Sequence, residues 1–486
     1  FEGRDTGSEG IRKATDYITK RYEQMGLTPV GDNGTYEQHF ELSAPSVDSY
    51  KYIVKDASGN TVSQTSLSKQ ETGDFVTIFG GSDDVSGDII FAGLGVSNDS
   101  GVNHLPESVE NKWVMVLLDR QLTNQRALQS LTSNGAAGVI MIMDYDEPEG
   151  FGEVVEQAQS RLGASGRLSL AYLQNNNPSA AWNRISPELA ATLLNLDSST
   201  SVAELAASLK ENPNDFTPTE LDYSLSHEAI VNNNTVKASN IAAFIEGSDP
   251  DLKDEVVVLS AHHDHVGIGR PDSTGDALYN GADDDGSGTV GLLHTAQAMI
   301  TAKEAGAGPK RSVLFLHVTA EEKGLLGSRY YSDHPIFPIE NTIANINVDM
   351  IGRVDKEHEE DKNYIYVIGG EIISSGLDSL LNVANQSSSN IDLSKLYNDL
   401  NDPNQFYIRS EHWNFARLGV PFVFFFNGTH DDYHRPSDSI DKIEWEALTK
   451  RTQLIYTFTA KVANSAIRPE VDNQEFIQKT QSQARN

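Results

Sequence analysis

Short apolar runs alternate with amphipathic segments through the second half of the chain. Four of these runs are apolar enough to form buried strands. They lie at residues 256–259, 313–318, 344–348 and 421–426. Residues 287–302 place an apolar side chain every three or four positions, which predicts a helix, and residues 444–462 predict another. This alternation predicts an α/β fold with a mixed, mostly parallel sheet sandwiched by helices.

The first half of the chain has a related pattern with more interruptions. Residues 10–25 predict an amphipathic helix that ends at Gly26, and residues 40–54 predict strands. Three buried strands and two helical stretches are predicted further on. The strands lie at 88–93, 113–119 and 139–143, and the helical stretches at 125–133 and 190–209. The turn-forming residues 212–215 then indicate a boundary.

These signals divide the chain into four predicted parts. We expect residues 1–65 and 216–468 to form the principal domain, and residues 66–215 to form a smaller, β-rich α/β domain inserted into it. Residues 469–486 are polar, and we expect this tail to be bound to the surface or disordered.

Composition narrows the class of protein. The chain has 486 residues, of which 38% are hydrophobic, so it can bury sizeable cores. Its net charge of -33 opposes binding to nucleic acids and to anionic membranes. Because it has no cysteine, disulfides and thiolate metal sites are excluded.

The ends of the chain and its apolar runs bear on location. No apolar run approaches the roughly 18 residues that cross a bilayer, so we expect no membrane insertion. The chain begins at Phe1 rather than at a methionine, without a signal-like segment. We therefore expect a processed product whose export signal has been removed, and a secreted or periplasmic location.

Five side chains that can bind metal follow predicted strands or precede the predicted helix at 287–302. They are His262, Asp284, Glu322, Asp349 and His434. In open α/β sheets, ligands collect beyond the carboxyl ends of the strands, so these side chains should meet at one edge. Two imidazoles and three carboxylates suit a pair of zinc ions.

Neighbouring residues refine the roles within this set. Asp264 stands two positions after His262 and is suited to hold the second ring nitrogen of that histidine, whereas His263 and His265 are expected to face elsewhere. Three adjacent carboxylates at 283–285 repel one another, and a cation would remove this cost. We choose Asp284 as the carboxylate that bridges two ions.

Structural roles compete with each of these functional ones. Adjacent Glu321 and Glu322 point in different directions, so one can bind metal while the other accepts a proton, but such pairs also occur as solvated residues at strand ends. Asp349 could cap a turn, and a buried Tyr433–His434 pair could be structural. Five candidates at one edge of one sheet favour the functional role.

Longer motifs around these residues resemble a known family. The motifs are 262–264 (His-His-Asp), 281–288 (Gly-Ala-Asp-Asp-Asp-Gly-Ser-Gly), 320–328 (Ala-Glu-Glu-Lys-Gly-Leu-Leu-Gly-Ser), 347–352 (Asn-Val-Asp-Met-Ile-Gly) and 432–438 (Asp-Tyr-His-Arg-Pro-Ser-Asp). Together they resemble the M28 family of dinuclear zinc aminopeptidases over roughly residues 220 to 465. Residues 409–412 resemble the family's Ser-Asp-His segment, with Glu411 in place of the usual aspartate. Residues 135–140 and the preceding strand resemble the protease-associated (PA) domain that many members carry as an insertion.

The resemblance implies a zinc-peptidase, phosphorylase/hydrolase-like fold and a role for each ligand. His262 and Asp349 would bind one zinc ion, Glu322 and His434 the other, and Asp284 would bridge the two. Two zinc ions with a shared water would make a hydrolase.

It also implies three residues that act on the substrate. Glu321 would be the general base and later protonate the leaving amine. Tyr433 would polarise the scissile carbonyl or hold the oxyanion. Arg409 would contact the substrate, although a surface salt bridge fits this position equally well.

The expected activity is therefore that of a metal-dependent exopeptidase releasing N-terminal amino acids from peptides with a free N-terminus. A carboxypeptidase or dipeptidase of the same fold is the main alternative, but the motifs lack an obvious arginine cluster for a substrate carboxylate. A glutaminyl cyclase-like enzyme and a non-catalytic receptor are weaker alternatives. We expect a monomer, because the dimeric relatives carry an extra helical domain after the peptidase domain.

Overall fold

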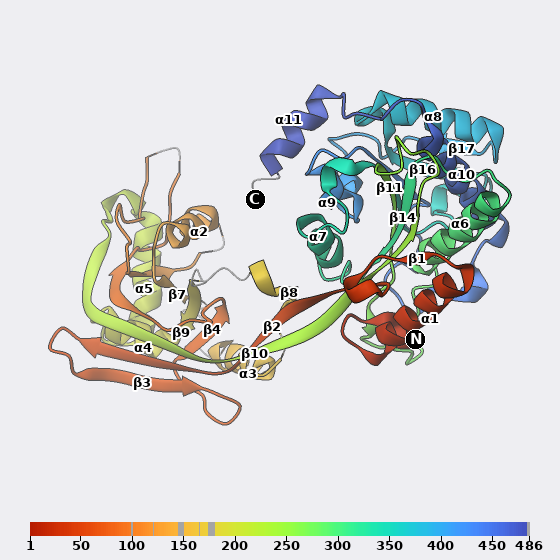
Figure 1. Ribbon diagram of the computed structural model, residues 1–486. Coiled ribbons are helices and arrows are strands. Elements are labelled where there is room, and N and C mark those ends of the chain that lie inside the picture. The colour runs from red at the N-terminus through yellow and green to blue at the C-terminus, as the bar shows by residue number, and fades with distance from the viewer. Residues whose placement is uncertain (99–100, 120, 144–149, 165, 174–179, 484–486) are drawn as a thin grey trace. The chain divides into compact units, whose positions relative to one another are not determined.

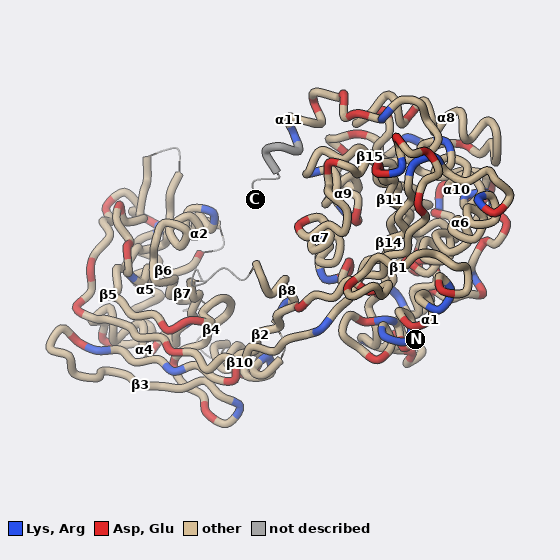
Figure 2. The backbone as a smooth tube through the Cα atoms, viewed as in Figure 1, with Lys and Arg blue, Asp and Glu red and all other residues tan. Residues whose placement is uncertain are grey.

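The computed structural model describes residues 1–98, 101–119, 121–143, 150–164, 166–173 and 180–483. The chain divides into two compact units (Figure 1). Unit 1 comprises residues 1–42, 169–172 and 236–486, and unit 2 comprises residues 43–168 and 173–235. Acidic residues are spread over both units, in keeping with the net charge of -33 (Figure 2).

Unit 1 is built on a mixed, mostly parallel sheet, as the sequence predicts. Its strand order is β17-β16-β18-β15-β11-β14-β10. The strands are β17 (Asp392–Ser394), β16 (Tyr364–Gly369), β18 (Phe422–Phe426), β15 (Thr342–Val348), β11 (Val256–His262), β14 (Ser312–Val318) and the last part of β10 (Thr219–Ile245). The four neighbours β18, β15, β11 and β14 run parallel. β10 is antiparallel to β14, and β16 is antiparallel to β18 but parallel to β17.

Helices cover both faces of this sheet, because alternate residues of each buried strand point to opposite sides. Val257 and Leu259 pack with four helices, and Val256 and Val258 pack with two others. The first group is α1 (Glu9–Met25), α6 (Gly286–Glu304), α8 (Ser375–Ser387) and α10 (Trp445–Asn464). The second group is α7 (Leu326–Asp333) and α9 (His412–Ala416). The predicted sandwich of helices and sheet is confirmed.

The first helix shows why the sequence predicts its ends well. The side chain of Ser8 accepts a hydrogen bond from the amide of Ile11 at the start of α1. Gly26 ends the helix with a φ of 75°, a left-handed conformation that glycine adopts at little cost. Ile18 and Tyr22 lie on its buried face against the sheet.

None of the helices in the described ranges is both long and apolar enough to cross a bilayer.

The polar tail contributes to the core of unit 1. Residues 474–483 form helix α11 (Gln474–Gln483), and Phe476 is only 1% exposed. Its ring centroid lies 6.2 Å from that of Phe422. The carboxylate of Asp472 accepts hydrogen bonds from the backbone amide of Ser375. Of the two expected forms, surface-bound and disordered, these residues take the bound one, because one aromatic side chain anchors an otherwise polar segment.

The strands of unit 2 lie in the order β10-β5-β6-β7-β9-β4. Its strands are the first part of β10, β5 (Val85–Phe91), β6 (Trp113–Leu117), β7 (Gly138–Ile142), β9 (Ala181–Ile185) and β4 (Phe75–Phe79). The strands β5, β6, β7 and β9 are parallel. Strands β2 (Glu37–Asp56) and β3 (Thr61–Leu67) form a hairpin. The part of β2 beyond residue 42 and all of β3 belong to unit 2. The likeness of this unit to a PA domain stays a prediction.

Four helices accompany these strands among the described residues of unit 2. They are α2 (Gln125–Ser133), α3 (Gly150–Arg161), α4 (Pro187–Leu193) and α5 (Ser199–Glu211). The single helical stretch predicted at 190–209 is thus two helices. Asn195, with a φ of 55°, lies in the break between them. Asparagine tolerates this left-handed conformation better than most residues do, which lets the chain turn there.

The division into units differs from the predicted domain boundaries at 65/66 and 215/216. The units divide at 42/43 and 235/236, inside the long strands β2 and β10. Turn-forming residues lie near both points, Pro45 in β2 and Asn232 to Asn234 in β10, but each strand continues through them without a loop. The turn-forming residues 212–215 instead end in a single helical turn, Pro213–Asp215, within unit 2.

Candidate metal centre and active site

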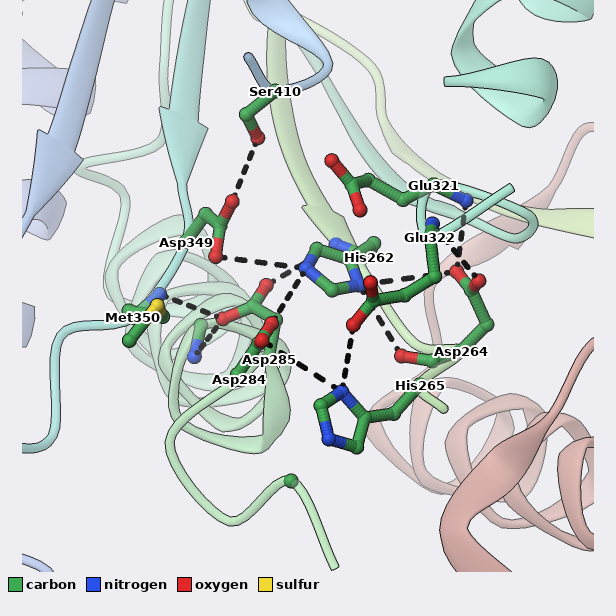
Figure 3. Close-up of polar contacts among 12 residues, drawn as sticks. His262, Asp264, His265, Asp284, Asp285, Glu321, Glu322, Asp349, Met350 and Ser410 are labelled. Atoms are coloured by element: carbon green, nitrogen blue, oxygen red, sulfur yellow. Dashed lines mark hydrogen bonds and ion pairs between the residues drawn. The ribbon is translucent and has the colours of Figure 1, made fainter. Parts of the chain in front are cut away.

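All five predicted ligands meet at the carboxyl edge of the unit 1 sheet (Figure 3 shows four of them). This follows from the parallel strands, which end at the same edge. His262 is the last residue of β11, Asp349 follows β15, and Glu322 follows β14. Asp284 lies just before α6, and His434 lies in the segment after β18.

Asp284 lies between the two histidines. Its Oδ1 is 3.2 Å from Nε2 of His262, and its Oδ2 is 3.1 Å from Nε2 of His434. Nε2 of His262 also lies 3.5 Å from Oδ1 of Asp349. Nε2 of His434 lies 3.2 Å from Oε2 of Glu322. The five side chains therefore form two groups that share one carboxylate.

The two neighbours of Asp284 have other tasks. Asp285 accepts backbone amides at both oxygens, from Gly288 and Met350 at Oδ1 and from His262 at Oδ2. It caps α6 and ties this helix to β11 and to the loop after β15. Although its oxygens lie near His262 and Asp349, which would permit an alternative cluster, these bonds already occupy them.

Asp283 is likewise engaged, because its Oδ1 accepts from the hydroxyl of Ser287 and from the amide of Gly352. Its Oδ2 lies 3.1 Å from Nε2 of His430. Of the three adjacent carboxylates, Asp284 alone directs both oxygens at His262 and His434.

The cluster has an unusual electrostatic character. Burial opposes charge on Asp284, yet His265, His262 and His434 hold the pKa of its carboxyl well below the usual range. Burial also opposes the charged form of His434, but Asp284 and Glu322 raise its pKa to about 10. Each carboxylate is thus stabilised by a nearby positive charge, which protons on the imidazoles or metal cations can supply.

The residues present fit zinc by two tests. Three buried oxygens lack a hydrogen-bond partner among the described residues, and a bound cation would satisfy them. They are Oδ2 of Asp284, Oε1 of Glu322 and Oδ1 of Asp349. Ligands of a tetrahedral zinc ion, at about 2.0–2.2 Å from it, lie roughly 3.3–3.6 Å apart. The four distances across the shared carboxylate, 3.1 to 3.5 Å, are close to this spacing.

Asp264 contacts His262 in a different way from the one predicted. Nδ1 of His262 lies 3.2 Å from the backbone carbonyl oxygen of Asp264 and 3.8 Å from its carboxylate. The carboxylate instead accepts the backbone amides of Glu321 and Glu322. Burial raises its pKa to about 6. Asp264 therefore holds the loop that carries both glutamates, and its main chain orients His262.

His265 is a site residue that the sequence prediction missed. It was expected to face elsewhere, but its fully buried ring places Nδ1 2.8 Å from Oε1 of Glu322 and 3.7 Å from Oδ2 of Asp284. His263 does face elsewhere, since its Nδ1 lies 2.8 Å from the carbonyl of Val318. The two histidines differ because β11 has ended, so strict alternation no longer predicts side-chain direction.

Glu321 and Tyr433 line one pocket together with four of the ligands. Burial raises the pKa of Glu321 well above its usual value. The ring of Tyr433 stacks on His434 with centroids 3.9 Å apart, and burial raises the pKa of its hydroxyl. Arg409 lines the same pocket, with its guanidinium 4.9 Å from the ring centroid of Phe406. Within the described ranges no ion pair of Arg409 occurs, so the predicted surface salt bridge is not seen.

Ser410 and Glu411 add a hydrogen-bonded extension to Asp349. The hydroxyl of Ser410 lies 2.8 Å from Oδ2 of Asp349 and 2.6 Å from Oε2 of Glu411, and it accepts from Nδ2 of Asn347. The Ser410 hydroxyl has one proton and can donate to only one of the two carboxylates. If it donates to Asp349, a proton on Glu411 is needed for the second hydrogen bond, from Glu411 to Ser410. Burial raises the pKa of Glu411 to about 7, which agrees with that count.

These features define an α/β protein with a metal-binding cluster at the carboxyl edge of its sheet. Residues 240–459 match the model of peptidase family M28.

The chain also resembles individual proteins. Over 258 residues it is 28% identical to Aminopeptidase Y of Saccharomyces cerevisiae, covering 50% of this chain and 42% of that protein. Over 232 residues it is 26% identical to a probable leucine aminopeptidase of Arthroderma otae, covering 47% and 58%. The chain thus spans about half the length of the curated relatives it matches. A solved aminopeptidase from Aneurinibacillus sp. strain AM-1 is 16% identical, with a TM-score of 0.49 over 96% of this chain and 91% of that chain.

Proposed function

We propose that this protein is a metal-dependent exopeptidase that releases N-terminal amino acids from peptides and binds two zinc ions. The observation that carries the proposal is the position of Asp284, whose two oxygens face histidines from two different segments of the chain. The match of residues 240–459 to the model of peptidase family M28 and the names of the curated relatives support a peptidase that acts at the N-terminus.

In this proposal the two groups of ligands hold one ion each. His262 and Asp349 hold the first, Glu322 and His434 hold the second, and Asp284 bridges them. When bound, such ions make a water acidic enough to lose a proton near neutral pH and polarise a carbonyl oxygen. The protein fixes the ligand directions through Asp264, Asp285 and Ser410, which contact ligands or the loops that carry them.

Glu321 is assigned the role of general base. It lines the pocket beside the ligands, and its raised pKa favours a group that takes up a proton and returns it to the leaving amine. The hydroxyl of Tyr433, on the same pocket wall, is assigned to the substrate carbonyl, where it would donate a hydrogen bond to the developing oxyanion.

The charge of the pocket favours a free α-ammonium group over a carboxylate. Glu321, Asp284 and Asp349 line it, and Arg409 is the one cationic side chain among its lining residues other than histidine. A carboxypeptidase or dipeptidase would need cationic side chains to hold the substrate's terminal carboxylate. Arg409 alone could contact such a group, so this second activity needs a direct test.

Blocked peptides separate the two activities. We expect the protein to cleave a peptide with a free amino terminus, to cleave its carboxyl-amidated form at a similar rate, and to leave its N-acetylated form intact. Rapid cleavage of the acetylated peptide with loss of the amidated one would contradict the proposal and favour a carboxypeptidase.

Three further expectations stay proposals. We propose a secreted or periplasmic location, a monomer, and a PA-like role for unit 2 in shaping access to larger substrates. Size-exclusion chromatography with light scattering tests the monomer, and cell fractionation tests the location. Comparing dipeptide and oligopeptide hydrolysis after substitutions on unit 2 tests its role.

A further inference from the structure

The segment 280–285, which carries Asp284, is held by Arg4, a residue far away in the sequence. The Arg4 guanidinium donates hydrogen bonds to the carbonyls of Asn280, Gly281 and Asp284 at 2.8, 3.1 and 3.2 Å. Its Nε donates to the carbonyl of His263 at 2.9 Å. One side chain therefore binds the two loops that carry His262 and Asp284. Hydrogen bonds from a charged donor are stronger than those between neutral groups.

The opposite side of the same segment is held by a carboxylate. Asp438 is fully buried and accepts the backbone amides of Asp283 and Asp284 at 3.0 and 3.1 Å. Its own backbone carbonyl accepts the amide of Ala282. Arg4 therefore binds carbonyls of segment 280–285, and Asp438 binds its amides. These contacts satisfy backbone polar groups that no strand or helix pairs.

Arg4 is itself fixed in place. Its backbone carbonyl accepts the amide of His265 at 3.1 Å. The next two residues contact the loops that follow β11 and β14. Thr6 donates a hydrogen bond to the carboxylate of Asp264, and Asp5 pairs with Lys323 at 2.6 Å. Gly3 passes so close to the backbone of Gly267 that a side chain would collide with it. The N-terminal segment is therefore built against the loops that carry the ligands.

We propose that Arg4 and Asp438 are positioning residues that together set the direction of the Asp284 carboxylate. This inference rests on the proposed function, since it assumes that Asp284 bridges two ions. A bridging carboxylate must aim its two oxygens at two ions at once, so a small rotation of segment 280–285 weakens both. Arg4 lies outside residues 240–459, which match the family model, so the N-terminal segment completes the site.

Lysine should not replace Arg4. The guanidinium is a planar fork that reaches four carbonyls from fixed directions, whereas the lysine ammonium is a single point donor. In the protein carrying Arg4→Lys we expect affinity for the more weakly bound ion to fall roughly 10–100-fold, as for other residues that orient metal ligands. We expect kcat to fall similarly, with KM changed by less than about threefold.

The test compares Arg4→Lys, Asp438→Asn and two matched controls. Arg12→Lys changes an exposed arginine of α1 that pairs with Glu9, and Asp441→Asn changes a nearby exposed aspartate. Zinc affinity is measured by competition with a chromophoric chelator. The visible spectrum of the cobalt-substituted protein reports the geometry around the ions. The proposal predicts lower affinity and an altered spectrum for the two test variants and no change for the controls.

Chemical rescue sharpens this result. Guanidinium ion added to the Arg4→Ala protein should restore part of the lost zinc affinity, whereas methylammonium should not. If Arg4→Lys and Asp438→Asn bind two zinc ions as tightly as the wild type and lose only thermal stability, the positioning role is contradicted while the proposed function stands. If the wild-type protein binds no zinc, both proposals fall.

Discussion

The strands of the two units share a parallel architecture but differ at their carboxyl ends. In unit 1, β11, β14 and β15 end at or within four residues of His262, Glu322 and Asp349, which lie beside Asp284 and His434. In unit 2 the parallel strands β6, β7 and β9 are buried throughout, as those of unit 1 are, whereas β5 is buried only over its last three residues. Among the described residues of unit 2, however, no three side chains of the metal-binding types come together.

This comparison separates what the fold requires from what the chemistry requires. The core of unit 2 is apolar around Trp113 and its neighbouring strands, and it needs no ligand to be stable. Unit 1 buries several carboxylates within a few ångströms of one another, an arrangement that costs free energy unless cations compensate it. A parallel sheet therefore supplies the edge, and the residues at its strand ends decide whether that edge becomes a site.

The largest expected effect comes from the assigned base. Glu321→Gln keeps the size of the side chain but removes its capacity to take up a proton, so kcat should fall roughly 10²–10⁴-fold. Zinc content by elemental analysis should not change, because Glu321 is not assigned as a ligand. The matched control Glu228→Gln removes an exposed ion pair with Lys51 in unit 2 and should leave kcat unchanged. Wild-type turnover in the Glu321→Gln protein would refute the assignment.

Removal of the bound metal should affect unit 1 and leave unit 2 unchanged. A ligand present at 100 times its dissociation constant stabilises the folded state by about 2.7 kcal/mol. Chelation should therefore speed amide hydrogen exchange at the carboxyl ends of β11 and β15 while exchange in β6 and β7 stays as it was. Equal acceleration in both units, or none in either, would contradict the difference described above.

The proton on Glu411 should make the metal-free protein sensitive to pH. Because the folded-state pKa of about 7 lies above that of an unfolded glutamate, its stabilising contribution is full below about pH 4.3. It is lost as the pH rises through about 7. Glu411→Gln keeps a donor for the hydroxyl of Ser410, so the slope of unfolding free energy against pH should flatten between pH 5 and 8. Urea unfolding of the chelated wild-type and Glu411→Gln proteins measures this slope. An unchanged slope would show that another group carries the proton.

The smallest effect is expected in unit 2. His227 is buried among Tyr50, Tyr52 and Trp113, and burial lowers its pKa. A histidine whose folded-state pKa is depressed contributes stability above its unfolded pKa of about 6.5, and this is lost as the pH falls. Unit 2 should lose stability as the pH falls below about 6.5, seen as lower exchange protection in β6 and β7. His227→Gln should remove this dependence, and its persistence would assign the titration to another group.

The sequence predicted the sheet edge of unit 1 well because the evidence for it is local. The apolar runs at 256–259 and 344–348 end close to His262 and Asp349, so strand prediction and ligand placement reinforce each other there. Prediction worked less well where the signal is not local. The direction of His265 depends on a loop after the strand, and the contacts of Arg4 join residues more than 250 positions apart. The predicted boundaries at 65/66 and 215/216 lie away from the points where the compact units divide, because strands β2 and β10 run through those points without a break.

The central claim is that Asp284 bridges two ions held by His262 and Asp349 on one side and by Glu322 and His434 on the other. A crystal structure of the zinc-soaked protein, with anomalous differences collected on both sides of the zinc absorption edge, tests it most directly. We predict two anomalous peaks, each within bonding distance of a different oxygen of Asp284. A single peak, or two peaks that leave Asp284 without a bond to either ion, would contradict the account.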